Sequence, residues 1–152
     1  MGGYGTKLAS MLGRKLIVSQ LILAGASVDG VGSFPKDTAL MDAAKAGNQE
    51  CVMILLGAGA EVNGQNKSGS TPLIEAVHGN SIECLRILIK SRASLDLPDT
   101  RGRTALFHAV SSSYEDISIA LVDAGADTTS SDFEGISIMG LIKNSRMSLR
   151  LN

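Results

Sequence analysis

A repeat with a step of about 33 residues constrains the fold of this chain more than any other feature of its sequence. Four short strings that resemble one another keep this step, with one extra residue in the first interval, and they start at Gly25, Gly59, Arg92 and Gly125. A second series, of the type Thr-Ala-Leu, keeps the same step without interruption and starts at Thr38, Thr71, Thr104 and Ser137. A sustained period of this length predicts a stack of similar units, each of which buries its apolar face against its neighbours.

The best-defined unit predicts two short helices. Thr71 can accept a hydrogen bond from the free amides at a helix start, and Pro72 suits the first turn, where no amide donor is needed. The first helix is expected from Pro72 to about Val77, and His78-Gly79-Asn80 reverse the chain because such residues tolerate left-handed backbone. A second helix follows, with one apolar face formed by Ile82, Leu85, Leu88 and Ile89. The polar segment that joins two units predicts a loop or β-hairpin turning near residues 99–102.

The composition excludes several classes of function. The chain is globular in character, with 44% apolar and 19% charged residues, and 14 basic against 15 acidic residues leave a net charge of −1. Balanced charge creates no field that would attract nucleic acid or an acidic membrane. Aromatic residues are only 3% and Trp is absent, which excludes a stacking platform for single-stranded nucleic acid. No apolar run reaches the roughly 18 residues that a membrane span requires.

Cysteines and histidines are too few to indicate a reactive site. Two cysteines cannot build a disulfide framework, which favours an intracellular setting, cytoplasmic or nuclear. Cys51 and Cys84 stand one step of the repeat apart at the same second-helix position, so we expect buried thiols rather than a redox or metal pair. The two histidines, His78 and His108, occupy different repeat positions and are not expected to form a ladder. We therefore expect no enzymatic activity, no cofactor and no metal.

These strings resemble the ankyrin repeat, whose pattern includes Asp-x-x-Gly-x-Thr-Pro-Leu, an Ala-rich first helix and Leu-Leu-x-x-Gly-Ala-Asp-Val-Asn. Segments 71–73 and 55–63 come close to that pattern, and the step between the units is the one typical of the family. The resemblance implies an all-α fold, an ankyrin-repeat solenoid of stacked helix-turn-helix units joined by β-hairpin-like loops. It covers a single domain over 1–152, with units at about 4–32, 33–65, 66–98 and 99–131 and a truncated or capping unit at 132–152.

Some positions depart from the family's pattern. Arg92 stands where the family usually has Gly. Ser113 takes the Gly position between two helices, where we expect a strained or frayed turn. In the last unit Ile142 and Lys143 occupy the sites of an Ala pair, and the chain stops at Asn152 before the second helix can present its Leu-Leu pair. We expect this unit to fray first, and the chain to be a fragment of a longer array rather than one with an unusual cap.

The resemblance also implies where a partner would bind. In such a stack the first helices and the hairpin tips line a concave groove, and the second helices form the outer side. We expect the partner to be another protein or a peptide. We expect no binding of nucleic acid and no insertion into a membrane, and we expect the chain to be a monomer. The candidate contacts are Phe34, Asp37, Lys45, Lys67, Ser70, His78, Arg101, Arg103, Phe133 and Ile136. Phe34 and Phe133 occupy equivalent tips three steps apart, where each either anchors a partner or folds back against its own hairpin.

One alternative to a free-standing binding module stays open, and one possible modification site adds to it. The chain could be an excised regulatory or targeting segment of a larger enzyme, a ubiquitin-ligase adaptor or a channel. Separately, Asn63 resembles the ankyrin site that an intracellular iron- and oxoglutarate-dependent asparaginyl hydroxylase modifies, with Leu55, Glu61 and Val62 at the expected spacings. The competing interpretations are that Asn63 holds its own turn through its side chain, or that it deamidates because Gly64 follows it.

Overall fold

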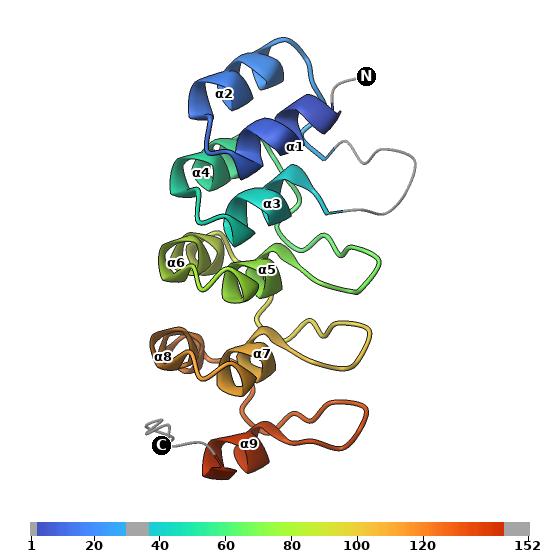
Figure 1. Cartoon of the computed structure of the whole chain (residues 1–152), viewed down its shortest axis with the longest axis vertical. Coiled ribbons are helices and arrows are strands. Elements are labelled where there is room, and N and C mark those ends of the chain that lie inside the picture. The colour runs from blue at the N-terminus through green and yellow to red at the C-terminus, as the bar shows by residue number, and fades with distance from the viewer. Residues whose placement is uncertain (1–2, 30–36, 145–152) are drawn as a thin grey trace.

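The chain forms pairs of short antiparallel helices stacked in a column, as a computed structural model shows for residues 3–29 and 37–144 (Figure 1). The described residues form nine helices and no strand. Their bounds are α1 (Gly3–Met11), α2 (Lys15–Leu23), α3 (Ala39–Lys45), α4 (Gln49–Gly57), α5 (Pro72–His78), α6 (Ile82–Lys90), α7 (Ala105–Ser111), α8 (Glu115–Asp123) and α9 (Ile138–Asn144). The expected all-α solenoid of helix pairs is thereby confirmed.

The predicted helix start recurs along the column. The Thr71 hydroxyl accepts a hydrogen bond from the Ile74 amide at 3.2 Å, and Pro72 is the first residue of α5. The equivalent residues Thr38 and Thr104 cap α3 and α7 in the same way. Each cap satisfies one of the amides that a helix start leaves without an intrahelical partner.

The turn between the two helices of a pair uses left-handed backbone at one fixed position. The residues there have φ values of 66°, 74°, 50° and 58°, at Gly13, Gly47, Asn80 and Ser113. Asn80 therefore supplies the reversal predicted for this segment, whereas Gly79 has an ordinary φ of −81°. Gly79 is needed for a different reason, since a Cβ there would collide with the carbonyl oxygen of Lys45. Glycine at the left-handed position, as at Gly13 and Gly47, serves backbone conformation. Glycine one residue earlier, at Gly79, allows close packing.

The core is a continuous aliphatic stack between successive pairs. Leu55, Leu88 and Leu121 occupy one equivalent site of α4, α6 and α8, and all three are fully buried. The first helices contribute small residues such as Ala43, Ala76 and Ala109, which let neighbouring helices approach closely. Cys51 and Cys84 are free, buried thiols, as expected. Apolar burial of this kind stabilises each pair only through its neighbours.

The loops that precede α5, α7 and α9 project to one side of the column (Figure 1). Each is fixed by an Asx side chain near its start. Oδ1 of Asp99 accepts hydrogen bonds from the amides of Arg101 and Arg103 at 2.8 and 2.9 Å. Asn66 and Asp132 make the same two bonds in their own loops. Within the described ranges the only β-bridge is an isolated one between residues 131 and 137. Backbone hydrogen bonds also close each loop, for example from the amide of Asp99 to the carbonyl of Arg103 at 2.9 Å. The loops are therefore hairpin-like turns held by both backbone and Asx side-chain bonds.

Two expected departures from the family's pattern appear in the backbone. Arg92 has a φ of 63° and Ser113 a φ of 58°, where a residue with a Cβ is strained. At the end of the column α9 forms as a helix with Ile138 fully buried. The fraying expected for the last unit, 132–152, stays a prediction, and residues 145–152 of that unit lie outside the described part. None of the described helices is long and apolar enough to span a membrane.

Candidate functional site

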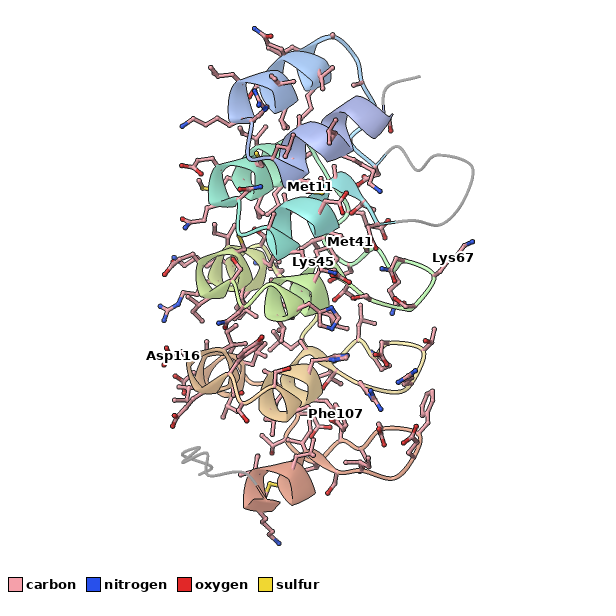
Figure 2. The ribbon with its side chains drawn as sticks, viewed as in Figure 1. Met11, Met41, Lys45, Lys67, Phe107 and Asp116 are labelled. Carbon is pink, nitrogen blue, oxygen red and sulfur yellow. The ribbon has the colours of Figure 1, made fainter. Side chains whose placement is uncertain are left out.

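The first helices stand between the loops and the second helices (Figure 1). Figure 2 shows Lys67 at the tip of a loop on one side of the column and Asp116 on α8 at the other side. The loop tips and the adjacent faces of α3, α5 and α7 therefore lie on one side of the column. This is the side on which the family resemblance implies a groove, and we call it the tip-and-groove face. Its candidate residues differ in how freely they present their side chains.

The tips are joined to one another through the backbone. The amide of Thr100 donates to the carbonyl of Ser68 at 2.9 Å, and the amide of Phe133 donates to the carbonyl of Arg101 at 2.9 Å. At Gly69 a Cβ would come within 2.9 Å of the Asp99 backbone, so this tip must lie close against its neighbour. The result is a fixed row of tips rather than independent loops.

Two of the candidates carry exposed apolar surface. Phe133 is 78% exposed and Ile136 is 41% exposed. The Phe133 ring lies over Gly102 of the neighbouring tip, where an added Cβ would come within 2.6 Å of it. Phe133 therefore does not fold back against its own loop. It rests on the adjoining tip with most of its surface open. Phe34, its predicted equivalent, lies outside the described residues.

The two arginine candidates have different roles. Arg101 is exposed, and it fixes the tip only through its main chain. Arg103 is partly buried, and its Nε lies 3.3 Å from Oδ2 of the fully buried Asp132 carboxylate in the next loop. Its guanidinium also lies over the Phe107 ring, 5.4 Å from the ring centre. Arg103 is therefore a clamp between loops, whereas Arg101 can meet a partner.

The remaining loop candidates also divide into structural and accessible groups. Ser70 was expected to contact a partner, but it is only 3% exposed and therefore belongs to the interior of the loop. Asp37 accepts a hydrogen bond from the side-chain amide of Asn66 at 2.5 Å, which ties two successive loops together. Lys67 is exposed at its tip. Sequence position alone places these residues on the same face but does not separate the two groups.

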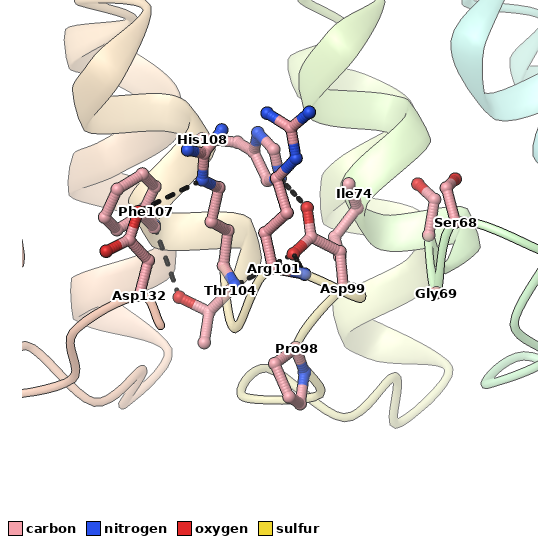
Figure 3. A network of polar contacts seen from close by, with 12 residues as sticks. Ser68, Gly69, Ile74, Pro98, Asp99, Arg101, Thr104, Phe107, His108 and Asp132 are labelled. Carbon is pink, nitrogen blue, oxygen red and sulfur yellow. Dashed lines mark hydrogen bonds and ion pairs between the residues drawn. The ribbon is translucent and has the colours of Figure 1, made fainter. Parts of the chain in front are cut away.

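A network of polar contacts crosses three helices on the tip-and-groove face. Sequence reasoning missed this network. Lys45 Nζ lies 3.0 Å from Glu75 Oε2, and His78 Nδ1 lies 3.4 Å from the same oxygen. His78 Nε2 lies 3.4 Å from His108 Nδ1. His108 Nε2 in turn lies 3.0 Å from Asp99 Oδ2 (Figure 3). The two histidines do meet, because His108 lies one pair further along and one helical turn earlier than the repeat equivalent of His78.

The two carboxylates of this polar network, Glu75 and Asp99, are held in their ionised form. Burial alone would raise the pKa of Glu75, but the neighbouring His78 ring, Ser70 hydroxyl and Lys45 ammonium favour the ionised carboxylate and lower the pKa to about 2. Burial likewise opposes ionisation of Asp99, yet the amides of Arg103 and Arg101 and the ring of His108 lower its pKa below the ordinary value. The pKa of His108 is lowered because burial disfavours its charged form. A buried Glu one turn before His78 was the sequence signal that could have revealed this network.

Asn63 links two units rather than closing its own turn. Its Oδ1 accepts a hydrogen bond from the amide of Ser94 in the next loop at 2.8 Å. Asp29 and Asp96 stand at equivalent positions and accept the amides of Glu61 and Asp127 in the same manner. The interpretation of Asn63 as holding its own backbone is therefore wrong, and the residue belongs to a series of bonds between neighbouring units.

The described part of the chain contains no group of three or more His, Cys, Asp or Glu side chains arranged to hold a metal ion. What the tip-and-groove face offers is exposed cations, exposed apolar side chains and a fixed backbone. Comparison with curated proteins gave no match. A family model described as ankyrin repeats in three copies matches residues 7–99 and again 40–132, so together the matches span most of the chain. With the stacked helix pairs and the capped loops, this match shows that the chain belongs to the ankyrin-repeat family.

Proposed function

We propose that this chain binds another protein or a peptide through the tip-and-groove face and performs no chemistry of its own. Ankyrin repeats are generally protein–protein interaction modules and typically not catalytic. The observation that carries the proposal is the pairing of a 78% exposed Phe133 with the exposed Arg101 on adjoining tips. Aromatic residues and arginine dominate the energetics of protein interfaces. In this function the chain acts as one domain over 1–152 and as a monomer.

The partner we expect carries an apolar side chain and a carboxylate close together. Phe133 and Ile136 offer apolar contact, and Arg101 next to them offers a guanidinium that can bind a carboxylate bidentately. Lys67, Lys45 and His78 extend the surface along the column with further cationic or polar groups. Because the tips are joined by backbone hydrogen bonds, little conformational freedom would be lost on binding.

Affinity capture with quantitative mass spectrometry tests this function. Arg101→Glu combined with Phe133→Ala should lower the affinity for the bound partner by more than about fivefold, the equivalent of about 1 kcal/mol. Arg103 is left unchanged because its substitution would break the clamp to Asp132. Met53→Gln on α4 is the matched control, since Met53 is 51% exposed on the outer side. A partner retained by the double variant and lost with Met53→Gln would place binding on the outer face instead.

We also propose Asn63 as a candidate hydroxylation site, on the resemblance described above. The side chain is only partly buried, but its Oδ1 is engaged by the Ser94 amide, so modification would have to compete with a bond between units. Mass spectrometry after co-expression with the active hydroxylase tests this. A gain of one oxygen on Asn63 supports the proposal, and an unmodified or deamidated residue contradicts it.

A further inference from the structure

The contact between His78 and His108 is unusual because both rings are also engaged on their far sides. Oδ2 of Asp99 lies 3.0 Å from Nε2 of His108, and Oε2 of Glu75 lies 3.4 Å from Nδ1 of His78. An ionised carboxylate only accepts hydrogen bonds, so Nε2 of His108 carries its ring proton, and the nearby Glu75 carboxylate favours the proton of His78 on Nδ1. In the neutral rings the two inner nitrogens, Nε2 of His78 and Nδ1 of His108, are then both bare lone pairs.

Two bare lone pairs that face each other repel unless something lies between them. The two inner nitrogens are 3.4 Å apart, which is longer than the roughly 2.7–3.2 Å typical of a hydrogen bond from an N–H donor. Two Zn–N bonds of about 2.0–2.1 Å that meet at a tetrahedral angle place their nitrogens about 3.3–3.4 Å apart. The spacing therefore fits a shared metal ion as well as a long N–H···N hydrogen bond.

We propose that His78 and His108 bind one divalent transition metal ion of the Zn²⁺, Ni²⁺ or Cu²⁺ class through these two inner nitrogens. Imidazole nitrogen is a preferred ligand of these ions. The arrangement of carboxylate, imidazole, metal, imidazole and carboxylate is also the one in which outer partners fix the tautomer and orientation of metal-binding histidines. Glu75 and Asp99 supply that support here from α5 and from the loop before α7.

The site has two protein ligands and an open side. The described residues offer no third side chain in ligating position, so the remaining coordination positions belong to water or to a group that a bound molecule brings. The His78 side chain is 36% exposed and that of His108 is 17% exposed, so the pair is reachable from the groove. Lys45 and Arg103 lie near it, but each is paired with a carboxylate, Glu75 and Asp132 respectively. An ion at this site would present open positions to whatever occupies the groove.

Calorimetric titration of ZnCl₂ into the metal-free, untagged full chain at pH 7.5 tests the proposal. The chain has only two histidines, so a single binding event that is weakened at least tenfold by His78→Gln and by His108→Gln is expected. Asp99→Asn should also weaken binding about tenfold, because it removes the carboxylate behind His108. Asn66 holds the equivalent loop, so this change is expected to preserve the fold.

Two further measurements make the result decisive. Electron paramagnetic resonance of the Cu²⁺-loaded chain should show two nitrogen ligands in the wild type and fewer in either histidine variant. The variant Cys51→Ala with Cys84→Ala is the matched control and should bind Zn²⁺ unchanged, since both thiols are buried. Absence of binding, binding that survives both histidine variants, or binding lost in the cysteine control would overturn the proposal. These measurements use the isolated chain, so their failure would leave the proposed partner binding untouched.

Discussion

The first helix pair and the middle pairs share one backbone repeat but not one surface. Leu16 on α2 is 74% exposed, whereas the equivalent residues in the following pairs are acidic: Glu50, Glu83 and Asp116. Leu23 is 87% exposed, and its equivalents are Gly57, Lys90 and Asp123. The period thus fixes where a side chain points, while the residue type at that position changes between the end of the column and its middle.

A second position shows what a neighbour contributes. Ile17 on α2 is 42% exposed, while its equivalents Cys51, Cys84 and Ile117 are 1%, 0% and 1% exposed. The site is the same in every pair, and only the presence of a preceding pair buries it. Stability in this fold is therefore a property of the interfaces between pairs, and it should be concentrated in α3 to α8.

The largest expected difference concerns leucine truncation. Leu88→Ala on α6 removes a fully buried side chain and should lower the free energy of unfolding by about 2–5 kcal/mol. Leu23→Ala on α2 truncates a residue that is 87% exposed and should change it by less than about 0.5 kcal/mol. Denaturant unfolding of both variants measures the contrast. Equal losses would mean that the first pair is as firmly packed as the third.

A smaller effect separates two acidic residues at equivalent positions. Glu75 has a folded-state pKa of about 2, below its ordinary value of 4.5, so the unfolded chain binds its proton first as the pH falls. Its contribution to stability is therefore complete above about pH 4.5 and is lost between about pH 4.5 and 2. Asp42, which faces Lys7 of α1 at 3.6 Å, has its pKa raised by burial, so its ionised form costs stability at neutral pH.

Substituting the two residues tests this difference. Glu75→Gln should cost about 1–3 kcal/mol at pH 7 and should flatten the loss of stability between about pH 4.5 and 2. Asp42→Asn should leave stability at pH 7 unchanged or slightly higher. Urea unfolding at several pH values measures both, with Glu83→Gln on the exposed side of α6 as the control. A Glu75→Gln variant that keeps the acid dependence of the wild type would contradict the assignment.

The smallest expected effect comes from backbone strain in the middle of the column. Arg92 has a φ of 63° at the position where Gly59 and Gly125 have 87° and 95°. Arg92→Gly should therefore raise the free energy of unfolding by up to about 1 kcal/mol, and Gly125→Ala should lower it by a similar amount. No atom lies within 4 Å of a Cβ at Gly125, so strain alone would cause the loss. Thermal unfolding compares the two, and changes of the same sign would contradict the argument.

The sequence predicted those features that depend on the residue type at equivalent positions of the repeat. The capped helix starts at Thr71 and Thr104, the buried thiols and the strained turn at Ser113 all follow from local chemistry and the period, whereas the positive φ of Arg92 came from the structure. The site was less predictable. Placing a residue on a tip says which face it belongs to, but not whether a carboxylate from the next loop engages it, and this distinguishes Arg103 from Arg101.

The contact between the two histidines escaped for a geometric reason. Comparison at equal positions pairs His78 with Ser111, which is its repeat equivalent. His108 lies one helical turn before Ser111, so its contact with His78 runs diagonally across two helices. Diagonal contacts depend on the offset between stacked helices, which the sequence period does not specify. The burial of Ser70 depends likewise on how closely one loop lies against its neighbours.

Hydrogen exchange of the backbone amides tests most directly the central claim that interfaces between pairs hold this chain together. Amides of α5, α6 and α7, which have a packed pair or helix on both sides, should exchange most slowly and at a common rate. Amides of α1, α2 and α9, which lie at the ends of the described column, should exchange at least about tenfold faster. Equal protection of α9 or α1 and of α5 would contradict the claim and show that each pair is stable without its neighbours.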